Sequence, residues 1–162
     1  MRGVRLDVLE PEAPASLIRV RSAAAGDGYF PEPDQDKLGD GCFTPDDLLS
    51  ASQEGFRIVG RISDVINVAG KKVNPAEVEA ELLRFQGVRA AVVFGLSSTL
   101  RNEEVAACVV AGEGVREMEL LEFCRGRLSG WQVPKRIFFL DEIPVNERGK
   151  ISRRELAQRF GA

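Results

Sequence analysis

Two Gly-Lys pairs, Gly149-Lys150 and Gly70-Lys71, are the positions at which this sequence could act on anions. A lysine ammonium on its long flexible side chain can neutralise negative charge where two anions meet. Neither pair belongs to a P-loop, because the glycine that should stand five residues before the Gly-Lys pair is missing. A Gly-Lys pair beside a helix start is by itself commonly a solvated turn, so its meaning depends on the surrounding sequence.

The composition excludes several kinds of site. The chain has 162 residues and no histidine. It therefore cannot form a Ser-His-Asp or Cys-His nucleophilic site, or a metal site that depends on imidazole. Cys42, Cys108 and Cys124 are odd in number and widely spaced. This pattern favours reduced thiols over a disulfide framework or a zinc cluster.

Charge and hydropathy also limit the partners. The net charge of −3 provides no basic surface for nucleic acid and no polybasic patch for a membrane. No apolar run approaches the length of a membrane span, and the opening MRGVRLDVLE lacks the apolar centre of a secretory signal. We therefore expect a cytoplasmic protein.

The elements around the first Gly-Lys pair are predicted by local signals. Residues 56–59 are typical of a strand, and a domain boundary is expected at Gly60–Asp64. A glycine-containing loop should follow, through Gly70. Asn74 and Pro75 fit the cap and first position of a helix, which the apolar spacing extends over 75–85.

The rest of the chain divides into a β-rich part and an α/β part. Alternation over residues 3–10 and the apolar run at 17–20 predict two strands, and the Gly, Pro and Asp content of 22–47 predicts mostly loop. Further strands are expected at 88–95, 105–110 and 137–140, and helices at 116–128 and 152–160. The core residues of the first of these helices should be Met118, Leu120, Leu121, Phe123, Cys124 and Leu128.

The predicted fold class is α+β. Residues 1–59 form a small β-rich piece, 60–64 a hinge, and 65–162 a compact α/β domain in which about three helices pack on a short sheet.

Two motifs together carry a family resemblance. The first runs from Gly60-Arg61 through Gly70 to the segment VNPAEVE (residues 73–79), and the second is PVNERGKISRREL (residues 144–156). They resemble the opening and closing motifs of the C-terminal domain of AMP-forming acyl-activating enzymes, which include acyl-CoA synthetases, aryl-CoA ligases, luciferases and peptide-synthetase adenylation domains. The resemblance covers essentially the whole chain, so that residues 1–59 would be the last β-rich subdomain of the large adenylation domain.

The resemblance implies roles for individual residues. Lys150 corresponds to the catalytic lysine, which would bridge a substrate carboxylate and the α-phosphate of ATP. Asp47 corresponds to the carboxylate that accepts the ribose hydroxyls, and Arg61 would approach the ribose or phosphates. Alternatively, Asp47 lies in a solvated acidic turn, and Arg61 is a surface cation paired with Asp64.

The hinge and the thiol site are implied in the same way. Ser63 and Asp64 occupy the hinge at which the C-terminal domain would rotate. The loop Asn67-Val68-Ala69-Gly70 would line the tunnel for a CoA or pantetheine thiol, and Lys71 and Lys72 are either phosphate contacts or surface charges. No residue of this chain is expected to bind a metal.

By the same resemblance, the chain would be part of a ligase that converts a carboxylic acid and ATP to an acyl-adenylate and passes the acyl group to a thiol. The resemblance implies ATP, Mg²⁺ and CoA or phosphopantetheine as cofactors. The Mg²⁺ would be bound by the large N-terminal adenylation domain, which this sequence lacks, so the chain alone should be inactive. A binding module for CoA, a carrier protein or a partner chain, or one half of a split enzyme, would explain the same motifs. The acid, the choice of thiol carrier and the oligomeric state are not predicted.

Overall fold

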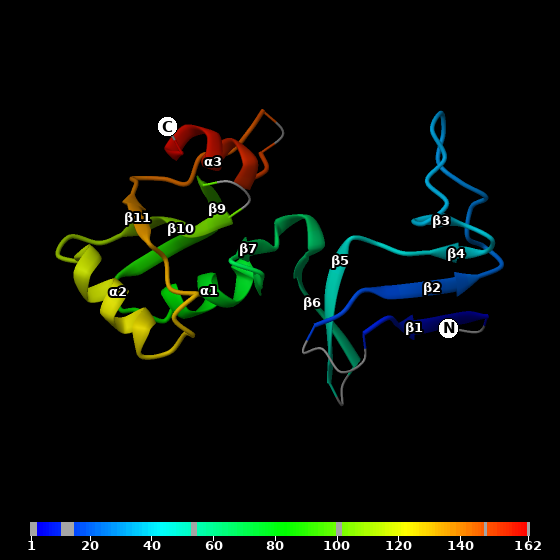
Figure 1. Cartoon of the computed structure of the whole chain (residues 1–162), viewed down its shortest axis with the longest axis horizontal. Coiled ribbons are helices and arrows are strands. Elements are labelled where there is room, and N and C mark those ends of the chain that lie inside the picture. Colours follow the sequence, from blue (N-terminus) through cyan, green and yellow to red (C-terminus); the bar gives the residue numbers. More distant parts are fainter. Residues whose placement is uncertain (1–2, 11–14, 53–54, 100–101, 148, 162) are drawn as a thin grey trace. The chain divides into compact units, whose positions relative to one another are not determined.

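The computed structural model describes residues 3–10, 15–52, 55–99, 102–147 and 149–161. The chain divides into two compact units, an N-terminal unit of Met1–Ser63 and a C-terminal unit of Asp64–Ala162 (Figure 1).

The N-terminal unit consists of β-strands. A four-stranded sheet has the order β1-β2-β4-β3, with antiparallel neighbours. Its strands are β1 (Val4–Val8), β2 (Ile18–Ser22), β3 (Leu38–Gly39) and β4 (Cys42–Phe43). The two strands predicted at 3–10 and 17–20 are present and pair with each other, and the segment 22–47 is mostly irregular, as expected, apart from the short β3 and β4.

A second antiparallel pair, β5 (Asp47–Ser52) and β6 (Gly55–Arg61), completes this unit. Strand β5 was not predicted, because DLLSAS has no clear alternation and depends on pairing with β6. Strand β6 is longer than the predicted 56–59 and ends at a short 3₁₀ turn, Ile62–Asp64.

The C-terminal unit is built on a mixed sheet of order β11-β10-β9. Strands β9 and β10 form a long antiparallel pair, whereas β11 runs parallel to β10 after the intervening helix α2. The elements are α1 (Pro75–Leu82), β9 (Val88–Thr99), β10 (Asn102–Ala111), α2 (Glu117–Arg125), β11 (Arg136–Phe139) and α3 (Arg153–Phe160). All the elements predicted for this unit are present, with ends that differ by a few residues.

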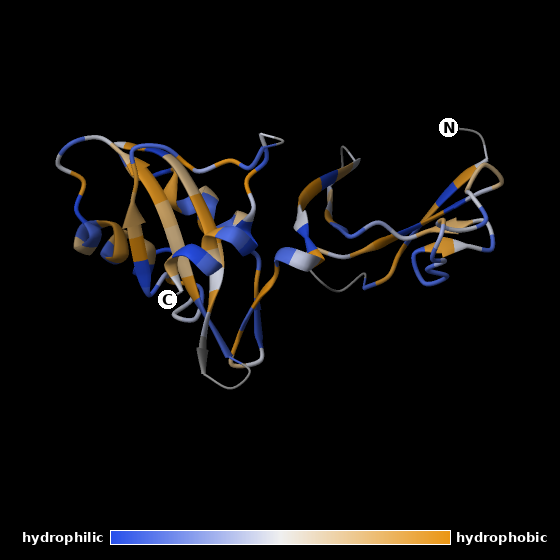
Figure 2. Cartoon of the chain, turned by 90° about the horizontal axis from the view of Figure 1, so that it is seen from above, coloured by the Kyte–Doolittle hydropathy of each residue, from blue (hydrophilic) through white to orange (hydrophobic). Residues whose placement is uncertain are grey.

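Helices cover both faces of this sheet (Figure 1). The buried core on one face contains residues of α1 and α2 such as Val78 and Leu120, packed on Val93 and Val109. The core on the other face contains Leu156 of α3, with Phe138 and Phe160 stacked at a ring distance of 4.5 Å. Figure 2 shows the corresponding concentration of hydrophobic residues along the strands.

The prediction that Met118 belongs to the core is wrong. Met118 is 80% exposed, because it lies on the side of α2 that faces away from the buried Leu120 and Cys124. None of the described helices is long and apolar enough to cross a bilayer.

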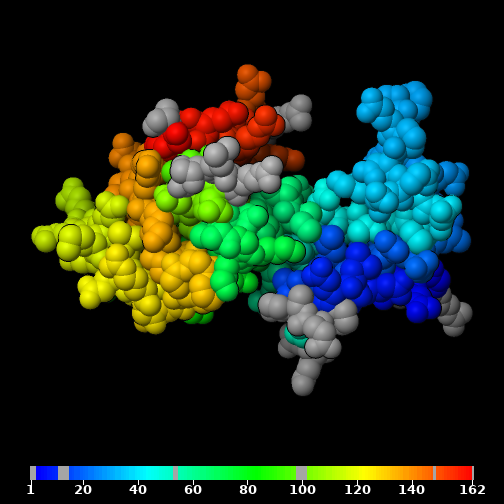
Figure 3. Space-filling model, viewed as in Figure 1, coloured from blue at the N-terminus to red at the C-terminus, as the bar shows by residue number. Residues whose placement is uncertain are grey.

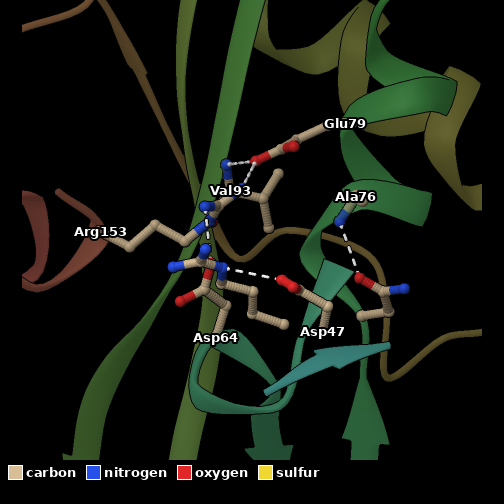
Figure 4. A network of polar contacts seen from close by, with 8 residues as sticks. Asp47, Asp64, Ala76, Glu79, Val93 and Arg153 are labelled. Atoms are coloured by element: carbon tan, nitrogen blue, oxygen red, sulfur yellow. Dashed lines mark hydrogen bonds and ion pairs between the residues drawn. The ribbon is translucent and has the colours of Figure 1, made fainter. Parts of the chain in front are cut away.

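The segment before α1, expected to be a loop, contains a hairpin of β7 (Ile66–Val68) and β8 (Lys71–Val73). Ile66 and Val73, at the two strand ends, pair with each other and are almost fully buried, which anchors the hairpin in the core. The predicted cap is confirmed, since Asn74 Oδ1 accepts a hydrogen bond from Ala76 N at 3.1 Å (Figure 4).

Candidate functional site

Lys150 lies in a closed loop directly before α3. Asn146 N donates to Lys150 O at 2.9 Å, Lys150 N donates to Asn146 Oδ1 at 3.0 Å, and Gly149 N donates to Asn146 O at 2.8 Å. Gly149 has a φ of 70°, which a residue with a Cβ adopts only at a cost. Arg148, which belongs to the same motif, lies outside the described residues.

The side chain of Lys150 is available to a ligand. The residue is exposed, and its ammonium has no ion-pair or hydrogen-bond partner in the described part of the chain. In Figure 3 the orange segment that precedes α3 projects from the surface of the C-terminal unit. The loop therefore presents a cation to solvent from a backbone that is held by its own hydrogen bonds.

Arg153, the first residue of α3, anchors this segment (Figure 4). Its guanidinium donates to Val93 O at 3.0 Å, to Asp64 Oδ2 at 2.9 Å and to Glu79 Oε1 at 2.8 Å. Glu79 Oε1 also accepts from Val93 N at 2.8 Å. One side chain thus connects α3 with β9, with α1 and with the first residue of the C-terminal unit.

The roles of Arg153 and Glu79 were not predicted from the sequence. No local sequence signal distinguishes Arg153 from its neighbour Arg154, and the contact joins residues 74 positions apart. For the alternative pairing of Arg61 with Asp64, the structure shows Arg61 in an ion pair with Asp47, and Asp64 in an ion pair with Arg153.

Asp47 and Arg61, the two predicted nucleotide-binding residues, face each other across β5 and β6. Arg61 Nε lies 3.0 Å from Asp47 Oδ1, and their side chains are 66% and 30% exposed. Asp47 is therefore the first residue of a strand and is held by a cation, which corrects its alternative placement in a solvated turn.

A pocket of about 950 Å³ adjoins this pair within the N-terminal unit. It is lined by Tyr29, by the loop 32–37, by residues 43–47 and by Arg61. Lys37 Nζ contacts Asp46 Oδ2 at 2.8 Å at its edge, and this hydrogen bond raises the pKa of Lys37. The pocket thus combines the aromatic rings of Tyr29 and Phe43 with carboxylates and cations.

The turn of the β7–β8 hairpin consists of Ala69 and Gly70, with φ values of 50° and 83°. Two positive φ angles define a type I′ turn, which suits Gly70 but is unusual for alanine. Three backbone amides of this hairpin donate to side chains, those of Asn67, Ala69 and Gly70. The predicted thiol-tunnel loop is therefore a tightly held hairpin end.

The two lysines after this turn differ. Both are exposed, but Lys71 Nζ lies 4.6 Å from the centre of the Trp131 ring, which is a cation–π contact. All three cysteines are free, as predicted. Burial raises the pKa of Cys108 and Cys124 to about 11, so neither is a nucleophile near neutral pH.

Comparison with known proteins gives consistent matches. Residues 77–150 match the family described as AMP-binding enzyme C-terminal domain. The chain is 36% identical over 146 residues to an oxalate–CoA ligase of Arabidopsis thaliana, which covers 87% of this chain and 28% of that protein. It is 39% identical over 139 residues to a feruloyl-CoA synthase of Amycolatopsis, which covers 83% of this chain and 28% of that protein.

Solved structures agree over almost the whole chain. ATP-bound MatB from Rhodopseudomonas palustris has a TM-score of 0.84 and 28% identity over 99% of this chain and 35% of that chain. The o-succinylbenzoate CoA synthetase of Bacillus subtilis, in complex with its acyl-adenylate intermediate, has a TM-score of 0.80 and 27% identity over 96% of this chain and 34% of that chain.

The chain thus spans about 28% of the length of these curated relatives and about a third of the solved structures. The α+β fold class expected from the sequence is confirmed by these structures. Through residues 77–150 and the similarity that extends on both sides of them, the chain belongs to the adenylate-forming superfamily and carries its AMP-binding enzyme C-terminal domain.

Proposed function

We propose that this chain is the C-terminal part of an AMP-forming acid–thiol ligase of the acyl-CoA synthetase type. The observation that carries the proposal is Lys150, an exposed ammonium without a protein partner among the described residues, on a loop fixed by Asn146 and anchored through Arg153. Structural relatives with bound ATP or an acyl-adenylate support this class of reaction.

Lys150 acts in the first half-reaction. A carboxylate oxygen attacks the α-phosphorus of ATP, the bond from that phosphorus to the bridging oxygen breaks, and pyrophosphate leaves. Negative charge accumulates where the two anions meet, and the ammonium of Lys150 neutralises it. Such a contact contributes about 3–4 kcal/mol to transition-state stabilisation.

Asp47 and Arg61 hold the nucleotide. Arg61 contacts one carboxylate oxygen of Asp47, so the other oxygen can accept hydrogen bonds from the ribose diol. The guanidinium of Arg61 stays two-thirds exposed and can approach the ribose or the phosphates. The adjoining pocket, with Tyr29 in its lining, supports binding of a nucleotide on this side.

Ser63 and Asp64 form the hinge between the two units. They lie at the boundary of the two compact units, in the short turn after β6, and a change of backbone dihedral angles at these two residues would be enough to reorient the C-terminal unit. Rotation at this point would withdraw Lys150 after adenylation.

The hairpin of Asn67, Val68, Ala69 and Gly70 then lines the path of the thiol. In the second half-reaction the thiol sulfur attacks the acyl carbonyl carbon, its proton is released, and AMP leaves. CoA or the phosphopantetheine of a carrier protein would supply this thiol.

The complete reaction also needs a large adenylation domain, which we propose as the main partner of these residues. That domain would provide the pocket for the acid and the ligands for Mg²⁺. On this basis the 162-residue chain by itself does not form an acyl-adenylate.

The test is to supply an adenylation domain, in the same polypeptide or as a separate chain, and to measure acid-dependent ATP–pyrophosphate exchange and thioester formation. Both activities are expected with the domain and neither with this chain alone. Calorimetry of this chain with CoA, AMP and an acyl-adenylate analogue is the companion measurement. Tight CoA binding without exchange in any combination would favour a binding module and refute the ligase.

A further inference from the structure

The turn of the β7–β8 hairpin is held from outside by the start of β10. Glu103 Oε2 accepts a hydrogen bond from Asn67 N at 2.7 Å, and Asn102 Oδ1 accepts one from Ala69 N at 3.1 Å. A third bond, from Gly70 N to Asn67 Oδ1 at 2.9 Å, closes the turn on itself. Two neighbouring residues more than thirty positions away in sequence thus bind the backbone of the proposed thiol path.

The sheet is shaped to let Glu103 reach the hairpin. A register shift separates Asn102 from Glu103 in the β9–β10 pair. Gly95, on β9, leaves room for the carboxylate, because a Cβ at this position would lie 2.5 Å from Glu103 Oε1 and 3.2 Å from Ile66 Cγ2. The side chain therefore passes over a glycine to the first amide after the buried Ile66.

The turn needs this support. Ala69 has a φ of 50°, and the left-handed conformation costs a residue with a Cβ about 1–2 kcal/mol. A carboxylate that accepts a backbone N–H makes a bond about twice as strong as a neutral one. The contacts from Glu103 and Asn102 offset the strain and tie the turn to the central β9–β10 pair.

We propose that Glu103 and Asn102 are positioning residues for the thiol-transfer step, since they fix the Asn67–Gly70 turn that would line the path of a pantetheine arm. This inference rests on the proposed ligase function. Because the three amides of the turn are already bonded, the turn is presented as one preformed surface and is not assembled when the thiol arrives. A misplacement of about 1 Å at such a surface can cost about 100-fold in rate.

The test compares four variants in a ligase that contains this chain together with an adenylation domain. Glu103→Ala and Asn102→Ala remove the acceptors, and Glu103→Gln retains one oxygen that can accept from Asn67 N. Glu113→Ala is the matched control, because Glu113 is an exposed carboxylate in the loop after the other end of β10. We expect Glu103→Ala to raise the KM for CoA at least about tenfold, with ATP–pyrophosphate exchange within about twofold of the wild type.

The Glu103→Gln variant is expected within about threefold of the wild-type KM, and Glu113→Ala at the wild-type value. A merely structural role would lower both half-reactions together in Glu103→Ala, and that result would overturn the inference. An unchanged KM for CoA in both Glu103→Ala and Asn102→Ala would overturn it as well.

A second readout uses the 162-residue chain itself and does not depend on activity. Amide hydrogen exchange at Asn67 and Ala69 should be slow in the wild type, and faster at Asn67 in Glu103→Ala and at Ala69 in Asn102→Ala. Fast exchange at both amides in the wild type would refute the bracing whatever the enzyme does. Slow exchange together with a ligase that forms adenylate but no thioester would instead refute the proposed thiol step, and this inference with it.

Discussion

Replacement of Arg153 by alanine tests the anchor of the lysine loop. The change removes the guanidinium contacts to Val93 O, Asp64 and Glu79. It leaves the Glu79 carboxylate, whose side chain is 17% exposed, with Val93 N as its remaining partner in these contacts. The C-terminal unit should therefore lose stability, and the base of the Lys150 loop should lose its fixed position.

The magnitude follows from the exposure of the three charged side chains. Arg153 is 28% exposed and Asp64 30%, so both ion pairs are partly screened by solvent. Each pair contributes about 1 kcal/mol in such a setting, and the hydrogen bond to Val93 O adds about 1 kcal/mol. We expect Arg153→Ala to lower the free energy of unfolding by about 3 kcal/mol, and Arg153→Lys by nearly as much, because a lysine cannot serve three divergent acceptors.

Urea denaturation of the 162-residue chain, followed by the fluorescence of Trp131, measures this effect. Trp131 is the single tryptophan and lies in the C-terminal unit, so it reports on that unit. Arg154→Ala is the matched control, since Arg154 is exposed in the same helical turn and has no partner among the described residues. A loss for Arg153→Ala within about 0.5 kcal/mol of the control would refute the anchoring role.

Three further predictions concern other parts of the chain. Gly149→Ala should lower the free energy of unfolding by about 1 kcal/mol, because Gly149 has a φ of 70°, and it should also lower the adenylation rate. Gly130→Ala is the control, because a Cβ has equal space there and the φ is not positive, and it should change neither quantity. Equal effects of the two variants in urea titrations and exchange assays would show that the glycine at position 149 is not required. Burial raises the pKa of Cys108 and Cys124 from 9.0 to about 11. The free energy of unfolding should therefore fall as the pH rises from about 9 to 11, by at most about 2.7 kcal/mol per thiol. A Cys108→Ala/Cys124→Ala variant that keeps the wild-type pH dependence would contradict this. Asp47→Ala should raise the KM for ATP about tenfold without changing the KM for the thiol. Asp27→Ala is the control, because Asp27 is an exposed carboxylate in the same unit. Steady-state kinetics in which both variants behave alike would exclude Asp47 from the nucleotide site.

Much of the C-terminal unit could be predicted because its signals are local. Asn74 and Pro75 mark the start of α1, and the apolar runs at 88–95, 105–110 and 137–140 mark the three strands of the sheet. These segments bury one or both faces, so their hydrophobic pattern reports directly on the fold. The placement of Met118 failed because helical spacing alone does not define which edge of an apolar stripe is covered.

The contacts that shape the candidate site could not be predicted, because they join distant residues. Arg153 and Glu79 are 74 positions apart, and Asn67 and Glu103 are 36 apart. Strand β5 depends on its pairing with β6, and the β7–β8 hairpin depends on the burial of Ile66 and Val73 under the sheet. Individual residues that could take part in chemistry could be identified in the sequence, but the distant side chains that hold them in position could not.

The half-reactions of a Lys150→Ala variant test the central claim most directly. In a ligase that contains this chain, acid-dependent ATP–pyrophosphate exchange should fall about 100- to 1,000-fold, as for the loss of about 3–4 kcal/mol of transition-state stabilisation. Thioester formation from an acyl-adenylate that is supplied ready-made should stay within a few-fold of the wild type. Exchange at the wild-type rate in the variant would contradict the account, because Lys150 would then not be the cation on which adenylation depends.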